Sequence, residues 1–258
     1  MEFSEVFREE RYYCNHLFRL LCHEKETGGP RSGLGAVLSE LGFSDNVTSA
    51  DVNAAQIYTE VAVFRDIFVA EKDKDHFADD LFQLFLPMIC SQHNWNVKEP
   101  IPPSAVRQKV GSVHPRKYAE ELRKIHASES DVRLYNEFSA LFNAKPDFLI
   151  IFRDKMFWVE AKFWASFSSS QIRRTRNIAD LCRSALFEEY FRMREPIIVL
   201  LGLKKKHSKT RLTEGARFLS WEQCQKISED LLPGGSANFT ARSISRMMDF
   251  NRSHLPGA

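Results

Sequence analysis

The stretch KPDFLIIFRDKMFWVEAKFW, residues 145–164, decides the fold that the sequence predicts. Its first run, Phe148–Phe152 (FLIIF), is continuously apolar, as expected of a strand that is buried on both faces. The polar residues 153–155 have the length of a hairpin turn, and a second strand-like run follows at 156–163. The stretch therefore predicts an antiparallel hairpin inside a sheet.

Three polar side chains lie at one end of this hairpin. Glu160 and Lys162 are two residues apart, so on a strand they project to the same side. Asp147 stands at the start of the first strand, which antiparallel pairing brings near the end of the second. We expect Asp147, Glu160 and Lys162 to converge while the rest of both strands stays apolar.

These residue types suit the hydrolysis of a phosphodiester bond. Two carboxylates, helped by a backbone carbonyl such as that of Ala161, are the hard oxygen ligands that Mg²⁺ or Mn²⁺ prefers. Such a metal ion acidifies water and neutralises charge that grows on the phosphate. A neighbouring lysine can orient or deprotonate the attacking water, or hold the phosphate as a point charge.

The alternative interpretation is that these residues are solvent-exposed charges without a functional role. Glu-x-Lys is common on solvated strand faces, and Pro-Asp often only starts a strand after a turn. Here the acid follows Pro146 and the Glu-x-Lys ends an unusually apolar hairpin. Burying two acids and a lysine in such a hairpin is costly without a metal or mutual pairing, which favours the metal site.

With Pro146-Asp147 on one strand and Glu160-Ala161-Lys162 on the next, the stretch resembles the core of the PD-(D/E)xK nuclease superfamily, over about residues 75–205. That resemblance implies a restriction-endonuclease-like fold: a helix, a three-stranded antiparallel meander, a second helix and a fourth strand parallel to the sheet. It assigns Asp147 and Glu160 as metal ligands, Lys162 as the catalytic lysine, and Mg²⁺ or Mn²⁺ as the cofactor.

The residues after Lys162 agree with this architecture. Residues 168–194 have apolar positions at helical spacing, serines that can cap the helix start, and Pro196 beyond the end. Residues 197–203 (IIVLLGL) form an apolar run suited to a parallel strand. The predicted fold class is α/β, a mixed central sheet flanked by helices with a helical N-terminal extension.

The residues before Asp147 are less specific. Residues 75–92 are a plausible helix that Pro87 should kink or end, and residues 95–101 a plausible first strand. The family places a further acid on a helix before the first strand, and a helix cap or surface charge is the favoured reading at every candidate. The candidates are Asp79 and Asp80, Glu137 on the helical pattern 132–142, and the pair Glu120 and Glu121.

Three regions follow from these patterns. Residues 1–72 are predicted to be a helical N-terminal region, with helices at 5–26, 35–41 and 51–70. Residues 73–211 are the predicted nuclease core, with an insertion at about 99–143 that includes a helix at 116–125. Residues 212–258 are a C-terminal helical region and tail, with a helix at 220–232.

Basic residues follow the site in two groups. Because cations beside a metal site suit a phosphate backbone, we expect both groups to contact nucleic acid, together with Gln171, which stands where many family members place a glutamine. For the second group alone, a solvated loop is an equal alternative. The groups are Arg173, Arg174 and Arg176 at the start of the helix, and Lys204, Lys205 and Lys206 after the last strand.

Composition bounds the remaining classes. The chain has 258 residues, a formal net charge of +2, and no run of eighteen apolar residues that would span a membrane. Five cysteines without a Cys-x-x-Cys pair favour a reducing cytoplasm and argue against an iron–sulfur cluster. The group Cys14, His16, Cys22 and His23 matches no zinc spacing, and a packed helix is favoured there.

The sequence thus predicts a cytoplasmic, Mg²⁺-dependent nuclease that cleaves DNA, with restriction or defence as its setting by analogy alone. One alternative is an RNase or a structure-specific nuclease of the same fold. The other is a non-catalytic module that binds nucleic acid or protein. Duplex cleavage usually needs two active sites, so a homodimer is expected.

Overall fold

The computed structural model describes residues 10–23, 32–43, 45, 47–95, 113–162, 167–204, 216–231 and 245. These residues form two compact units. The first, called the sheet unit, comprises the described residues within Met1–Glu60, Pro146–Ala179 and Met193–Ala258. The second, called the helical unit, comprises those within Val61–Lys145 and Asp180–Arg192.

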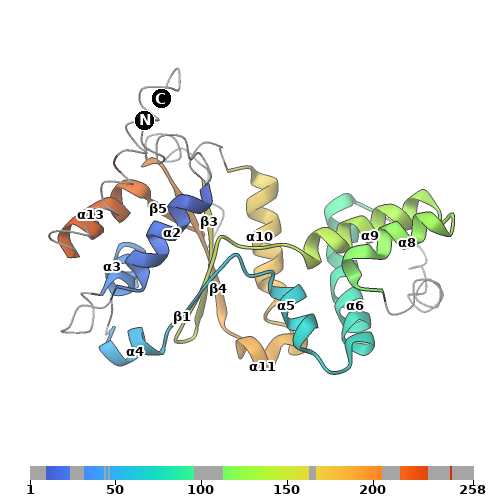
Figure 1. The fold of residues 1–258 in the computed structure, drawn as a ribbon, viewed down its shortest axis with the longest axis horizontal. Coiled ribbons are helices and arrows are strands. Elements are labelled where there is room, and N and C mark those ends of the chain that lie inside the picture. Colours follow the sequence, from blue (N-terminus) through green and yellow to red (C-terminus); the bar gives the residue numbers. More distant parts are fainter. Residues whose placement is uncertain are drawn as a thin grey trace, which may run out of the picture. The chain divides into compact units, whose positions relative to one another are not determined.

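In the described part of the chain, five strands form one mixed sheet in the order β1-β2-β3-β4-β5, so the protein is of the α/β class (Figure 1). The first three strands are antiparallel neighbours, and the last three are parallel neighbours. The strands are β1 (Gln56–Thr59), β2 (Phe148–Phe152), β3 (Lys155–Ala161), β4 (Glu195–Gly202) and β5 (Ala216–Ser220).

The central hairpin is the one that the sequence predicts. β2 pairs with β3 from Phe148 opposite Val159 to Phe152 opposite Lys155. Arg153 takes a left-handed backbone conformation (φ 52°) in the tight turn between them. All five residues of β2 are buried, which accounts for its continuous apolar run. The predicted parallel return strand is also confirmed, because β4 runs parallel to β3.

Helices cover both faces of this sheet (Figure 1). One face packs against α2 (Glu10–Leu21), α3 (Gly33–Glu40) and α13 (Trp221–Leu231), which share a core with alternate residues of β2, β3 and β4. α2 and α3 approach so closely that a Cβ on Gly33 would lie 1.7 Å from the Leu20 carbonyl oxygen. The opposite face carries α10 (Ser169–Leu181).

The helix predicted at 51–70 is wrong in its middle. α4 (Ser49–Ala54) begins with a capping box between Thr48 and Asp51 and ends at Ala55, whose backbone is extended. β1 follows, and α5 (Val63–Ala70) starts only after it. The β-forming residues of β1 pair with β2, a long-range contact that local helical spacing does not reveal.

The first strand predicted at 95–101 is not seen at Trp95, which follows the left-handed cap Asn94 of a helix. Residues 96–101 lie outside the described residues. The first strand of the antiparallel meander is instead β1.

The single helix predicted at 168–194 is also wrong. α10 ends at Leu181, Ser184 is extended, and two short helical turns follow as η2 (Ala185–Phe187) and α11 (Glu188–Phe191). The left-handed residue Arg192 ends α11. Burial of Phe187 and Phe191 in the helical unit explains why the apolar spacing continues past the break.

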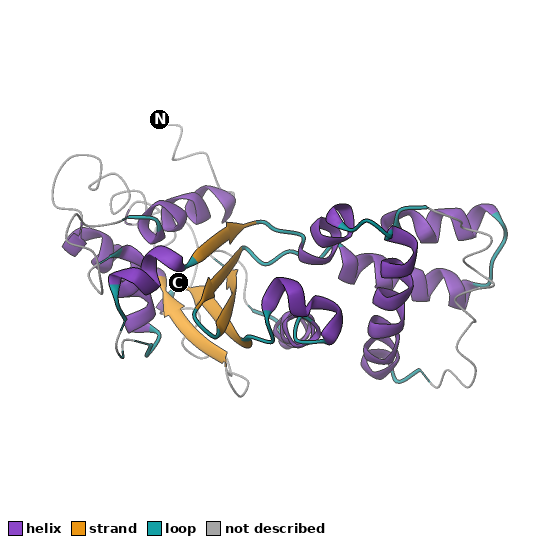
Figure 2. Ribbon diagram, turned by 90° about the horizontal axis from the view of Figure 1, so that it is seen from below, coloured by secondary structure: helices purple, strands orange, loops and turns teal. Residues whose placement is uncertain are grey.

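The helical unit is built around aromatic side chains. All described strands belong to the sheet unit (Figure 2). Phe64 lies 4.9 Å from Phe85 and 5.1 Å from Phe187, measured between ring centroids. Its elements are α5, α6 (Lys74–His93), η1 (Pro115–Lys117), α8 (Tyr118–Lys124), α9 (Glu129–Phe142), η2 and α11.

Pro87 lies inside α6 and does not end it, contrary to the expectation that this proline could end the helix. Phe85 and Ile89 on either side of it are buried, so packing holds the helix together across the proline. No helix in the described ranges is long and apolar enough to cross a bilayer.

Candidate functional site

Asp147 and Glu160 occupy neighbouring positions at one end of the β2–β3 hairpin. Phe148 and Val159 are the last residues that the two strands pair, so Asp147 and Glu160 lie one step beyond them. The Ala161 backbone amide donates a hydrogen bond of 2.7 Å to Oδ2 of Asp147. The Asp147 side chain is therefore held against the end of β3.

Glu160 faces α10 on the opposite side of the sheet from the core shared with α2, α3 and α13. Gln171 Nε2 donates to Glu160 Oε2 at 3.1 Å, and Thr175 Oγ1 donates to Glu160 Oε1 at 2.9 Å. Both carboxylate oxygens thus accept a hydrogen bond from the same helix. Thr175 is only 5% exposed, so its hydroxyl group depends on this carboxylate for a partner.

The surroundings of Glu160 raise its pKa from the ordinary 4.5 to about 7. Burial of the carboxylate is the largest cause, and the negative charge of Asp147 is the second. The Thr175 hydroxyl, the Lys162 ammonium and the Gln171 amide act in the opposite direction. Two carboxylates that repel each other in a partly buried place provide the electrostatic condition that a bound cation relieves.

Lys162 directly follows β3, and both of its backbone groups are anchored. Its N–H donates to the Leu201 carbonyl at 2.8 Å, and its carbonyl accepts a 3.3 Å hydrogen bond from Nε1 of Trp221. Trp221 is 1% exposed at the start of α13. Elements from the C-terminal part of the chain therefore fix the backbone of the lysine.

The predicted basic residues of α10 lie close to the site in sequence and on the same helix as Gln171. The Ser168 hydroxyl group accepts a hydrogen bond of 3.1 Å from the backbone N–H of Gln171 and so caps the start of the helix, as predicted. Arg173 and Arg174 are exposed, whereas Arg176 is half-buried. Their contact with nucleic acid stays a prediction.

Lys204 is the only member of the second basic group inside the described ranges. It is exposed, and its backbone N–H donates to both carboxylate oxygens of Glu222 at 3.0 and 3.2 Å. The predicted residues Lys205 and Lys206 lie outside the described residues.

The candidates for a further acid all belong to the helical unit, whereas Asp147, Glu160 and Lys162 belong to the sheet unit. Within the helical unit, Asp80 lies 3.6 Å from His76, and Glu137 lies 3.4 Å from His93. These contacts give both acids a local partner. A metal-binding role for Asp79, Asp80 or Glu137 stays a prediction.

Sequence reasoning missed Thr175 and Trp221. Thr175 stands four residues after Gln171, so helical spacing puts both on one face and could have indicated it. No local signal could have indicated Trp221, because its contact with Lys162 depends on how β5 and α13 pack on the sheet.

The residues present fit a divalent cation that takes few protein ligands. The described residues contain no cluster of three or more His, Cys, Asp or Glu side chains able to hold a metal. Mg²⁺ is commonly bound through one or two carboxylates and keeps several waters, so the pair Asp147 and Glu160 suits it. The same pair lacks the nitrogen and sulfur ligands of a structural zinc site.

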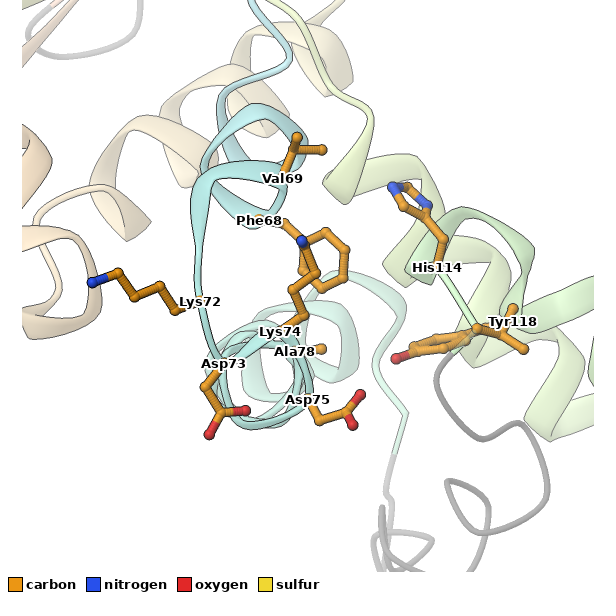
Figure 3. Close-up of a pocket in the computed structure, with 10 residues that line it drawn as sticks. Phe68, Val69, Lys72, Asp73, Lys74, Asp75, Ala78, His114 and Tyr118 are labelled. Atoms are coloured by element: carbon orange, nitrogen blue, oxygen red, sulfur yellow. The ribbon is translucent and has the colours of Figure 1, made fainter.

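A cavity of about 820 Å³ lies elsewhere, wholly in the helical unit (Figure 3). Phe68, His114 and Tyr118 line it together with two lysines, Lys72 and Lys74. The lysines are offset by two aspartates in the same lining, and none of the predicted site residues belongs to it.

No family model matches the chain, and neither a curated protein nor a solved structure is significantly similar to it.

Proposed function

We propose that this protein is a metal-dependent nuclease that hydrolyses DNA phosphodiester bonds at the Asp147–Glu160–Lys162 site. One observation carries the proposal: the Ala161 backbone amide holds the Asp147 carboxylate against the end of β3, next to Glu160, and Lys162 directly follows that strand. The negative charge of Asp147 raises the pKa of Glu160, and Lys162 opposes that rise. The resemblance of the same residues to the PD-(D/E)xK motif supports it.

Asp147 and Glu160 would hold Mg²⁺ or Mn²⁺ between the ends of β2 and β3. When bound there, the metal ion supplies acidification of water and neutralisation of charge on the phosphate. Lys162 is placed to bind the scissile phosphate or to orient the attacking water, since its backbone is fixed on both sides.

The nucleic acid would lie along the start of α10. Arg173 and Arg174 are exposed there, on the helix that also contacts Glu160. Positive side chains and the N-terminal end of a helix of 13 residues both favour phosphate. The helix would thus bind the backbone of the substrate beside the carboxylates.

A cleavage assay with the purified chain tests this function. Single-stranded, duplex and branched DNA and single-stranded RNA are incubated with Mg²⁺, with Mn²⁺ or with EDTA. We expect DNA to be cleaved with either metal and to stay intact in EDTA. Asp147→Asn should abolish cleavage while its thermal melting stays that of a folded protein.

The other outcomes separate the alternatives. Cleavage of RNA alone, or of branched DNA alone, would replace the substrate class and keep the chemistry. Binding without cleavage of any substrate in either metal would favour a non-catalytic module. Cleavage that persists in Asp147→Asn would place the activity at another site.

A further inference from the structure

Each of the two carboxylate oxygens of Glu160 accepts a hydrogen bond from a side chain of α10. The two donors differ in kind. Gln171 is half-buried and offers a flexible amide, whereas Thr175 is buried and offers a short, β-branched side chain. The two donors stand one helical turn apart, so a single face of α10 holds the carboxylate.

The contact of Thr175 is not the one that its position on a helix offers by default. A threonine inside a helix commonly donates to the backbone carbonyl three or four residues before it. Thr175 instead donates to Oε1 of Glu160 at 2.9 Å, across from the helix to β3. Its hydroxyl group therefore links α10 to the Glu160 carboxylate, instead of bonding within its own helix.

We propose that Thr175, assisted by Gln171, is a positioning residue that fixes the side chain of Glu160 in the orientation in which it binds the divalent cation. This inference rests on the proposed function, since it assumes that Glu160 is a metal ligand. Neither Thr175 nor Gln171 touches the reacting atoms in this account.

The geometry explains how one contact for each oxygen leaves room for a cation. An ionised carboxylate offers about four lone-pair directions, and two hydrogen bonds occupy only two of them. Asp147, whose side chain is held at the end of β3 by the Ala161 amide, would supply the second carboxylate to a cation there. Partners of this kind, which orient a metal ligand without touching the metal, typically change metal affinity about 10- to 100-fold when they are removed.

The test measures the dissociation constant of Mn²⁺ by the electron paramagnetic resonance of the free ion, without nucleic acid. Thr175→Val keeps the branched shape and removes the hydroxyl group, so we expect Mn²⁺ binding to weaken about 10- to 100-fold. Thr175→Ser keeps a hydroxyl group and should bind Mn²⁺ nearly as tightly as the natural protein. Ile172→Val, a buried change on the same helix, controls for altered packing and should bind normally.

Gln171→Met provides a second variant in case Thr175→Val does not fold. It removes the amide at a half-buried position and should weaken Mn²⁺ binding about 10-fold. Thermal melting of each metal-free variant shows which of them are folded. If every folded variant that lacks one of these donors bound Mn²⁺ as the natural protein does, the positioning role would be wrong.

Two further results would also contradict the inference, and the second of them would contradict the proposed function as well. Equal weakening in Thr175→Val, Thr175→Ser and Ile172→Val would show that packing of α10, not the hydroxyl group, matters. Failure of the natural protein to bind Mn²⁺, or equal binding by Glu160→Gln, would remove the metal site itself. By contrast, the result described above, in which the natural protein binds Mn²⁺ and every folded variant that lacks a donor binds it equally well, would overturn the positioning role alone.

Discussion

At the scale of single residues, Glu160 carries a carboxylate that the fold buries and also places beside a second carboxylate, Asp147. Both features disfavour its charged form, and its hydrogen bonds with Thr175 and Gln171 offset them only in part. A residue that weakens the metal-free fold in this way is expected at a site whose cation completes it.

Glu160→Gln should therefore stabilise the metal-free protein at alkaline pH. The pKa of Glu160 is about 7 in the folded protein and 4.5 ordinarily, so its ionisation removes stability as pH rises from about 4.5 to 7. Above that window the loss amounts to at most about 3 kcal/mol. Chemical unfolding in EDTA should show the variant to be more stable at pH 8, with the difference shrinking towards pH 4.5.

Saturating Mn²⁺ should reverse this order at pH 8, because only the natural protein gains stability from binding the ion. A variant that is no more stable than the natural protein at pH 8 in EDTA would show that Glu160 is not an energetic burden on the fold.

Lys162→Ala should lower the rate of DNA cleavage by at least about 100-fold, since a positioned acid–base or phosphate-binding group contributes about that much. Single-turnover cleavage with Mg²⁺ measures the effect. Lys155→Ala is the matched control: it changes a lysine at the other end of β3, which pairs with Asp154 and Glu195. Equal rates for Lys162→Ala and Lys155→Ala would refute the role assigned to Lys162.

At the scale of elements, α10 serves two purposes in the proposal. Its Gln171 and Thr175 contact Glu160, and its exposed Arg173 and Arg174 are placed to contact phosphate. Arg176 is half-buried, so it is a weaker candidate for a direct phosphate contact than the sequence pattern alone indicated.

The double variant Arg173→Ala/Arg174→Ala should weaken duplex DNA binding and reduce its salt dependence. Each lost phosphate contact removes about 0.9 from the slope of log affinity against log salt, so two contacts remove about 1.8. Fluorescence anisotropy in Ca²⁺ would measure both quantities. Lys117→Ala/Arg123→Ala makes the same charge change at exposed residues of η1 and α8. An equal fall in slope for both pairs would mean that the arginines of α10 have no special role.

α13 acts on the site through Trp221, whose indole N–H donates to the Lys162 carbonyl. Trp221→Phe keeps an aromatic ring and removes that donor, which should lower the cleavage rate about fivefold for a hydrogen bond of about 1 kcal/mol. Trp158→Phe is a close control, because Trp158 is equally buried and its indole nitrogen has no hydrogen-bond partner in the described part of the chain. A rate loss no larger in Trp221→Phe than in Trp158→Phe would argue against this link.

At the scale of the whole molecule, the sequence revealed those parts of the fold that local spacing determines. The hairpin of β2 and β3 has a two-residue turn and apolar runs that are adjacent in the chain. β4 is recognisable as an apolar run after a helical segment. The positions of Asp147, Glu160 and Lys162 at one end of the hairpin follow from strand alternation, so they too could be read from the residues.

The parts that sequence reasoning missed depend on contacts between distant segments. β1 is a strand of four residues at the sheet edge, and it meets β2 only after the chain has passed through most of the helical unit. β5 is a short edge strand that pairs with β4. Neither strand has the length or periodicity that distinguishes a strand from a loop. Both form because they pair with neighbouring strands that are distant in the sequence.

The proposed function requires Asp147 and Glu160 together to bind the metal ion on which cleavage depends. Crystals of the protein grown or soaked with MnCl₂ test it most directly through the anomalous scattering of manganese. We expect an anomalous peak within ligand distance, about 2.0–2.3 Å, of carboxylate oxygens of both residues. Manganese bound elsewhere in the chain, with Asp147 and Glu160 ligating none, would contradict it.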